Sequence, residues 1–141
     1  MSNAVSDTVP SRIKPVLGHD NKWWWDQAAA GQLVIQRCTS CQQLRHPPRP
    51  MCNHCQSMDW DYIQASGKGI ICSYTVLHHP KFPGYDYPLV IILVDLEEGT
   101  RFTSQLIDCD PDAVDFGMAV EMVMQKDADG FQLPVFKLAS N

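Results

Sequence analysis

The sequence predicts a mainly β protein, in which an N-terminal helix precedes a zinc ribbon and a five-stranded OB-fold β-barrel. Two C-x-x-C pairs, CTSC and CNHC, are separated by ten residues. Helix signals gather just before these pairs, and short apolar runs divided by turn residues follow them. At 141 residues, the chain is long enough for one ordinary domain or for a small module joined to a compact one.

The N-terminal part is predicted to hold a flexible arm and a short helix. Residues 1–20 contain prolines and polar side chains without periodicity, which is typical of a loosely held arm. The helix is expected over residues 21–32, because Asp20 or Asn21 can cap it and Gly31 stands where a helix stops.

Three consecutive tryptophans, Trp23, Trp24 and Trp25, fall within this helix. Consecutive helical residues are rotated by about 100°, so these side chains spread over about 200° of the helix surface. One face cannot bury all three, and we expect one or two to be buried. Tryptophan is common in interface hot spots, so we hypothesise that at least one anchors a partner enzyme or a second copy of the chain.

Residues 33–62 are predicted to form the zinc ribbon. A C-x-x-C turn brings two thiolates to one ion, and a second turn completes a tetrahedron with Zn–S bonds of roughly 2.3 Å. The expected ligands are Cys38, Cys41, Cys52 and Cys55. Iron uses the same four ligands and remains open. A closed four-thiolate site has no position for substrate, so the predicted metal is structural and His46 and His54 are not needed as ligands.

Residues 63–141 are predicted to form the barrel. Strands are expected at about residues 70–78, 89–96, 101–107, 119–125 and 131–138. Between the third and fourth strands, Asp110 can cap a short helical turn that begins at Pro111. This is the outline of an OB fold, although the strand count alone also fits a sandwich.

Charge and hydropathy restrict the function and the compartment. The net charge of −5 belongs to the C-terminal part, because residues 63–141 carry five basic and eleven acidic side chains. Phosphate backbones are bound by Lys and Arg, so a nucleic-acid-binding ribbon and barrel is the less favoured alternative. The start of the chain has no apolar core typical of a signal peptide, and no apolar run is long enough to cross a bilayer. We expect a cytoplasmic protein without membrane contact.

Several segments in a fixed order carry a family resemblance. The first is WDQAAAGQLVIQRCTSCQQLRHPPRPMCNHC, and GKGIICSYTVLH, YPLVIILVDLEEGTRFTSQLI, FGMAVEMVMQ and DGFQLPVFK follow it. Over about residues 22–138 the chain resembles the OB-fold acyl-CoA-associated proteins with an N-terminal rubredoxin-like zinc ribbon, long catalogued as a domain of unknown function. One departure is Gln42, which follows Cys41 where a zinc knuckle often has glycine.

The resemblance implies a non-catalytic accessory subunit. Members of this family accompany thiolase-like enzymes, aldolases and hydratases of acyl-CoA metabolism in lipid, sterol and ketone pathways, where they help to assemble the complex and to bind acyl-CoA. For this chain, the loop 79–88 is a candidate aromatic wall of an acyl-CoA site. The candidate cations for the phosphates are Arg45, Arg49, Lys68 and Lys81.

Independent catalysis is the third class of function, and the sequence disfavours it. His78 and His79 could supply acid–base chemistry, but adjacent residues of an extended chain point to opposite faces. Cys72 and Cys109 have no neighbouring residues that would mark a nucleophile, and Cys72 is expected to pack as a small apolar residue.

Overall fold

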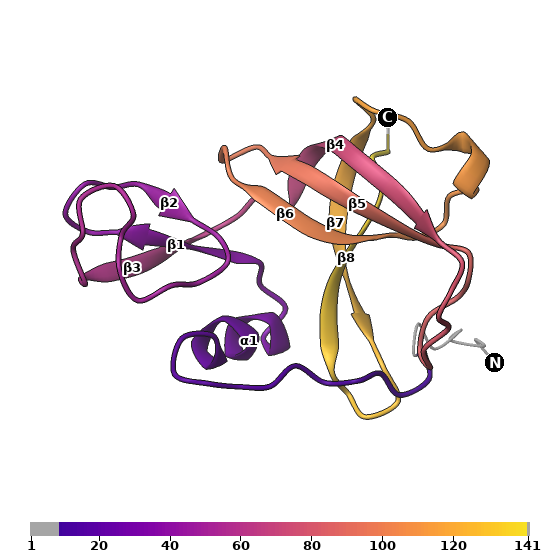
Figure 1. The fold of residues 1–141 in the computed structure, drawn as a ribbon, viewed down its shortest axis with the longest axis horizontal. Coiled ribbons are helices and arrows are strands. Elements are labelled where there is room, and N and C mark those ends of the chain that lie inside the picture. Colours follow the sequence, from indigo (N-terminus) through magenta and orange to yellow (C-terminus); the bar gives the residue numbers. More distant parts are fainter. Residues whose placement is uncertain (1–8, 141) are drawn as a thin grey trace.

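The computed structural model describes residues 9–140 and has two lobes, a small ribbon sheet and a β-barrel. The helix α1 (Lys22–Ala29) lies below the junction of the two lobes in Figure 1 and contacts both β1 of the ribbon and β8 of the barrel. Within the described residues, no helix is long and apolar enough to cross a membrane.

The ends of α1 follow the local sequence. The helix starts after Asn21, whose side chain accepts the backbone N–H of Gly18 (2.7 Å) and makes no cap hydrogen bond. At the other end, the N–H of Gly31 donates to Ala28 and that of Gln32 to Gln27, while Gly31 has a φ of 86°. This pair of bonds is a Schellman motif, which explains the glycine. The observed helix is shorter than the predicted range.

Asp127, in the hairpin between β7 and β8, fastens the N-terminal segment to the barrel. Its carboxylate accepts the backbone N–H of Arg12 (3.0 Å) and pairs with the ammonium group of Lys14. It also accepts the N–H groups of Asp129 (2.9 Å) and Phe131 (3.0 Å). Burial opposes the charge of Asp127, but these hydrogen bonds outweigh it and lower its pKa.

The expected flexible arm over residues 1–20 is therefore wrong for residues 9–14. Arg12 is only 4% exposed, and the N–H of Val9 donates to Lys126 (3.0 Å). Residues 1–8 lie outside the described part of the chain.

The ribbon sheet has three antiparallel strands in the order β2-β1-β3. They are β1 (Val34–Cys38), β2 (Leu44–Arg45) and β3 (Trp60–Gln64). The strands on either side of the cysteines lie where LVIQRC and WDYI predict them, whereas β2 is too short to show periodicity. Along β3, exposed and half-buried residues alternate, so this strand contributes no fully buried side chain.

The barrel is closed, with the strand order β4-β5-β6-β8-β7 and β7 paired back to β4. The strands are β4 (Lys68–Leu77), β5 (Leu89–Leu96), β6 (Arg101–Leu106), β7 (Ala119–Lys126) and β8 (Gln132–Leu138). The parallel pairing of β6 with β8 and the closure confirm the OB fold over the sandwich. The short 3₁₀ helix η1 (Pro111–Ala113) is capped as predicted, because the Asp110 side chain accepts the N–H of Asp112 (2.9 Å).

One hydrophobic core joins the two lobes. Ile92, Val94 and Phe136 are fully buried inside the barrel, and the same cluster continues through Phe102 to Trp24 of α1. It extends into the ribbon through β1, of which the N-terminal half is buried. The barrel end of the ribbon is thus held by apolar packing, and its far end carries the cysteines.

Candidate metal centre and ligand cavities

The four predicted cysteine ligands converge at the far end of the ribbon. Their Sγ atoms all lie within 4.8 Å of one another. The Sγ atoms of Cys38 and Cys55 are 3.5 Å apart, and those of Cys41 and Cys52 are 3.6 Å apart. A tetrahedron with Zn–S bonds of 2.3 Å has S···S edges of about 3.8 Å, so the cluster has the size that a four-thiolate metal site requires.

The two cysteine turns have equivalent backbones. The N–H of Gln42 donates to the Cys38 carbonyl, and that of Gln56 donates to the Cys52 carbonyl, both at 2.9 Å. Gln42 and Gln56 have φ values of 69° and 66°, the left-handed region that favours glycine. The sequence departure at Gln42 therefore leaves the turn geometry intact.

Backbone amides lower the pKa of two of the four cysteines, whereas the neighbouring thiols and burial raise the pKa of Cys41 and Cys55. The N–H of Cys41 points at the Sγ of Cys38 (3.5 Å) and lowers its pKa to about 6. The backbone amides of Cys55 and His54 lower the pKa of Cys52. Metal ions bind thiolates, so this arrangement suits metal binding.

The two histidines of the ribbon are not part of the cysteine cluster. His54 is exposed and only its backbone N–H approaches Sγ of Cys52 (3.4 Å). His46 packs against Trp24 and Phe102, with ring centroids 5.5 and 4.8 Å apart. Burial lowers the pKa of His46 to about 4, which keeps the ring neutral at pH 7.

The three tryptophans of α1 point to different neighbours. Trp24 is 5% exposed, and its Nε1 donates to the carbonyl of Val34 (2.8 Å). Trp25 is half-buried and packs near Phe131 of the barrel (5.2 Å). The triplet therefore joins the ribbon to the barrel. Trp24 is buried, as expected for one or two of the three, so the partner hypothesis now concerns Trp23 and Trp25.

Trp23 belongs to an aromatic patch at the surface of the ribbon. Its ring lies 4.6 Å from that of Trp60 and 5.4 Å from that of Tyr62, both on β3. Trp60 is 37% exposed and Tyr62 is 43% exposed. We call Trp23, Trp60 and Tyr62 the aromatic patch.

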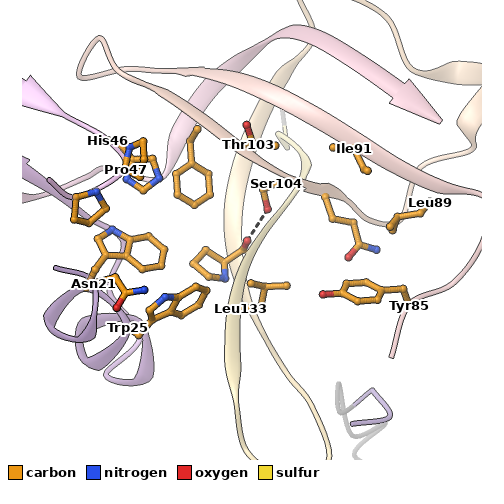
Figure 2. Close-up of a pocket in the computed structure, with 15 residues that line it drawn as sticks. Asn21, Trp25, His46, Pro47, Tyr85, Leu89, Ile91, Thr103, Ser104 and Leu133 are labelled. Atoms are coloured by element: carbon orange, nitrogen blue, oxygen red, sulfur yellow. Dashed lines mark hydrogen bonds between the residues drawn. The ribbon is translucent and has the colours of Figure 1, made fainter. Parts of the chain in front are cut away.

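An apolar cavity of about 430 Å³ opens between α1 and the barrel. Figure 2 shows Asn21 and Trp25 at its α1 side, Leu133 of β8 at its centre, and Tyr85 of the loop between β4 and β5 at its other end. Of the loop 79–88, Tyr85 lines this cavity. The remaining lining residues are Trp24, His46, Pro47, Pro48, Leu89, Ile91, Phe102, Thr103, Ser104, Gln105 and Pro134.

A second cleft, of about 420 Å³, lies between the loop that joins the two cysteine turns and the hairpin between β5 and β6. It brings together Arg45 and Arg49, two of the predicted cations, with Arg101, which sequence reasoning missed. Lys68 and Lys81 line neither this cleft nor the apolar cavity. We call it the arginine cleft.

The two hollows share a wall, because His46 and Pro47 line both of them. An apolar space and a cationic space therefore adjoin at the junction of the ribbon and the barrel. A ligand with an apolar arm and an anionic head has the matching chemistry.

The remaining candidate residues do not form a catalytic group. His78 and His79 are both exposed in the chain after β4. Cys72 lies at a β-bulge in β4, where the register shifts between Ile71 and Ser73, and it is half-buried. Burial raises the pKa of the Cys109 thiol, which disfavours a nucleophilic thiolate.

Two family models match consecutive parts of the chain. The ChsH2 rubredoxin-like zinc ribbon domain matches residues 25–61, and the ChsH2 C-terminal OB-fold domain matches residues 62–125. Both matches agree with the two lobes of the structure.

Similar proteins include enzyme subunits and scaffold proteins. A probable enoyl-CoA hydratase alpha subunit of Thermomonospora curvata is 44% identical over 91% of this chain, which spans only 40% of that protein. A DUF35 domain-containing scaffold protein of Methanothermobacter thermautotrophicus is 41% identical over 67% of this chain and 72% of its own length.

Among solved structures, a chain of the Ltp2-ChsH2(DUF35) aldolase superposes with a TM-score of 0.86 and 43% identity. The match covers 90% of this chain and all of that one.

Proposed function

Because the chain belongs to the ChsH2 (DUF35) family, in which a rubredoxin-like zinc ribbon precedes an OB-fold domain, we propose that it is a non-catalytic accessory subunit of an acyl-CoA enzyme. The observation that carries the proposal is the match to a chain of the Ltp2-ChsH2(DUF35) aldolase, which covers all of that chain and 90% of this one. The hydratase alpha subunit and the scaffold proteins support the same role. The partner is accordingly an aldolase, a hydratase or a thiolase-like enzyme.

The cavity supports a binding role more than a catalytic one. Among the described residues, its lining contains only two ionisable side chains, His46 and Tyr85. His46 is packed between aromatic rings and stays neutral, so it is poorly suited to proton transfer. We propose that the apolar cavity receives the pantetheine or acyl arm of an acyl-CoA that the partner enzyme turns over.

The metal in this proposal is a structural zinc. Four cysteines fill a tetrahedral coordination sphere and leave no position for substrate. Metal analysis of the purified protein would distinguish one zinc per chain from iron, which would give the visible absorption of a ferric thiolate site.

The aromatic patch is the proposed docking surface for the partner enzyme. It places large aromatic side chains at the surface of the ribbon sheet, and such side chains dominate many interfaces. A second copy of the chain is the alternative occupant, and the oligomeric state of the isolated protein distinguishes the two.

Reconstitution tests the proposal directly. The chain alone should not turn over acyl-CoA, while adding it to the co-purified acyl-CoA enzyme should raise that enzyme's activity. Tyr62→Ala should weaken the complex by about tenfold or more if the patch is an interface hot spot. Phe116→Ala, which alters an exposed aromatic residue outside the patch, is the matched control. Turnover by the chain alone would refute the accessory role, and an unchanged Tyr62→Ala complex would refute the docking surface.

A further inference from the structure

Arg45 is held in one orientation at the floor of the arginine cleft. Its Nε donates to Oε1 of Gln36 (3.0 Å), and its Nη2 donates to the carbonyl of Arg49 (3.0 Å). Gln36 is itself fully buried and also accepts the backbone N–H of Arg49 (2.8 Å). This network fixes both the guanidinium group and the loop that carries Arg49.

The third nitrogen of this guanidinium group has nothing to donate to. Arg45 is 8% exposed, and its Nη1 is a buried atom without a hydrogen-bond partner among residues 9–140. The hydroxyl of Thr100, which lines the same cleft, is also buried without a partner in that part of the chain. A buried donor without an acceptor destabilises the folded state, and a charged guanidinium group does so more strongly than a neutral donor. Both donors belong to residues that line this one cleft, and each lacks an acceptor in the described part of the chain.

The charge of the cleft specifies the kind of acceptor. Its described lining includes Arg45, Arg49 and Arg101 and contains no acidic side chain. Arg101 uses only Nε to pair with Asp95 (3.0 Å), an exposed contact that leaves its two terminal nitrogens available. Glu98, in the adjoining hairpin turn, does not line the cleft; its Oε2 accepts the backbone N–H of Ser66, and its Oε1 is buried without a partner among residues 9–140. Three guanidinium groups and a hydroxyl match a tetrahedral dianion.

We propose that the arginine cleft binds a phosphate group through Arg45, Arg49, Thr100 and Arg101, and that this phosphate belongs to the nucleotide end of an acyl-CoA. The second half of this statement rests on the proposed function. It follows from the shared wall at His46 and Pro47, which places the apolar cavity next to the phosphate site. The cleft binds the anionic head while the cavity receives the arm.

Calorimetric titration of the metal-loaded, full-length chain tests the site. The probes are adenosine 3′,5′-bisphosphate, which carries the phosphates without the arm, and pantetheine, which has the arm without phosphate. Arg49→Gln and Arg101→Gln alter exposed side chains and should keep the fold, whereas Arg45 is too deeply packed for a first variant. Each should weaken bisphosphate binding by about tenfold, as expected for a charged hydrogen bond. Thr100→Val should weaken it by about threefold.

Arg37→Gln is the matched control. Arg37 is also a ribbon arginine, but it pairs with Asp61 through two hydrogen bonds (2.8 and 2.7 Å) and does not line the cleft. Its loss should leave bisphosphate affinity unchanged within about twofold, because a paired charge outside the site adds little at physiological salt. Equal weakening by all three arginine variants would mean diffuse attraction and would overturn the site.

The two probes separate failure of the site from failure of the proposed function. If pantetheine binds and the bisphosphate does not, the phosphate site is refuted while the acyl-CoA arm of the proposed function survives. If the bisphosphate binds with the expected variant pattern but pantetheine does not bind and no acyl-CoA enzyme associates with the chain, the phosphate half of the proposal stands and its acyl-CoA half fails.

Discussion

Every strand of the barrel contributes at least one buried apolar side chain, whereas β3 of the ribbon contributes none. The barrel closes on a continuous core that includes Ile71, Ile92 and Phe136. At the far end of the ribbon, four converging thiols occupy the place of such a core. The difference teaches that this small module relies on metal binding where it lacks apolar volume, as expected for a segment of this size.

The position of the two hollows follows from this division. Both lie where the metal-held loop between the cysteine turns meets the barrel, and both include His46 and Pro47 of that loop. The cysteine turns therefore border the loop that forms the shared wall of both hollows. Loss of the metal should therefore disorder the loop that lines both hollows, while the barrel stays folded.

The largest expected effect is that of removing the metal. Structural four-cysteine sites contribute on the order of 10–16 kcal/mol of metal-binding free energy, so Cys52→Ser should unfold the far end of the ribbon. Hydrogen exchange should show loss of protection over residues 38–60, which form the far end of the ribbon, and retained protection in β5 and β8. Cys72→Ser, which changes a cysteine outside the cluster, is the control.

Protected ribbon amides in the metal-free Cys52→Ser protein would contradict this comparison. Simultaneous unfolding of the barrel would show instead that the shared core makes the two lobes one cooperative unit.

The second effect is that of a cavity in the barrel core. Phe136 is fully buried, so Phe136→Ala should lower the free energy of unfolding by about 3–5 kcal/mol. Urea titration measures this loss, and Phe116→Ala should cost far less because that residue is 64% exposed. The folded variant should still bind one metal ion per chain. If Phe136→Ala lost its metal but kept the stability of the barrel, Phe136 would support the ribbon and not the barrel, which would contradict this comparison.

The smallest effect concerns the junction and depends on pH. His46 has a pKa of about 4 in the folded protein, below the ordinary value of about 6.5, so the unfolded chain binds the proton more readily. The contribution of the neutral His46 ring to the free energy of unfolding is present above pH 6.5 and is lost as the pH falls towards 4. Between pH 7 and pH 5, the free energy of unfolding should fall by about 2 kcal/mol more in wild type than in His46→Phe, which lacks the titrating ring.

Urea titrations at the two pH values measure this difference, and comparing the two proteins cancels the acid sensitivity of the thiolates that they share. His78→Phe, at an exposed histidine, should retain the pH dependence of wild type. An identical pH dependence in wild type and His46→Phe would show that the ring can be protonated in place.

Most of the barrel can be predicted from sequence because its signals are local. The strand Leu89–Leu96 has the predicted bounds, and the cap at Asp110 with Pro111 is where short-range rules place it. The cysteine spacing likewise brings four ligands together without knowledge of the fold. Each of these features depends on residues that are close in sequence.

The features that could not be predicted join distant parts of the chain. Arg12 and Asp127 are 115 residues apart, and no local pattern pairs them. Arg101 enters the arginine cleft because its hairpin lies against the ribbon, a contact that β-strand periodicity does not encode. The three tryptophans show the same limit, since helix geometry gives their directions but not the neighbours that each one meets.

Affinity purification of the chain from its native organism at moderate salt, with mass spectrometry of the bound proteins and an absorbance measurement for nucleic acid, tests the accessory role most directly. The account predicts a stoichiometric aldolase, hydratase or thiolase-like enzyme and no nucleic acid. Recovery of RNA or DNA with its processing proteins, and of no acyl-CoA enzyme, would contradict it and favour the nucleic-acid-binding alternative.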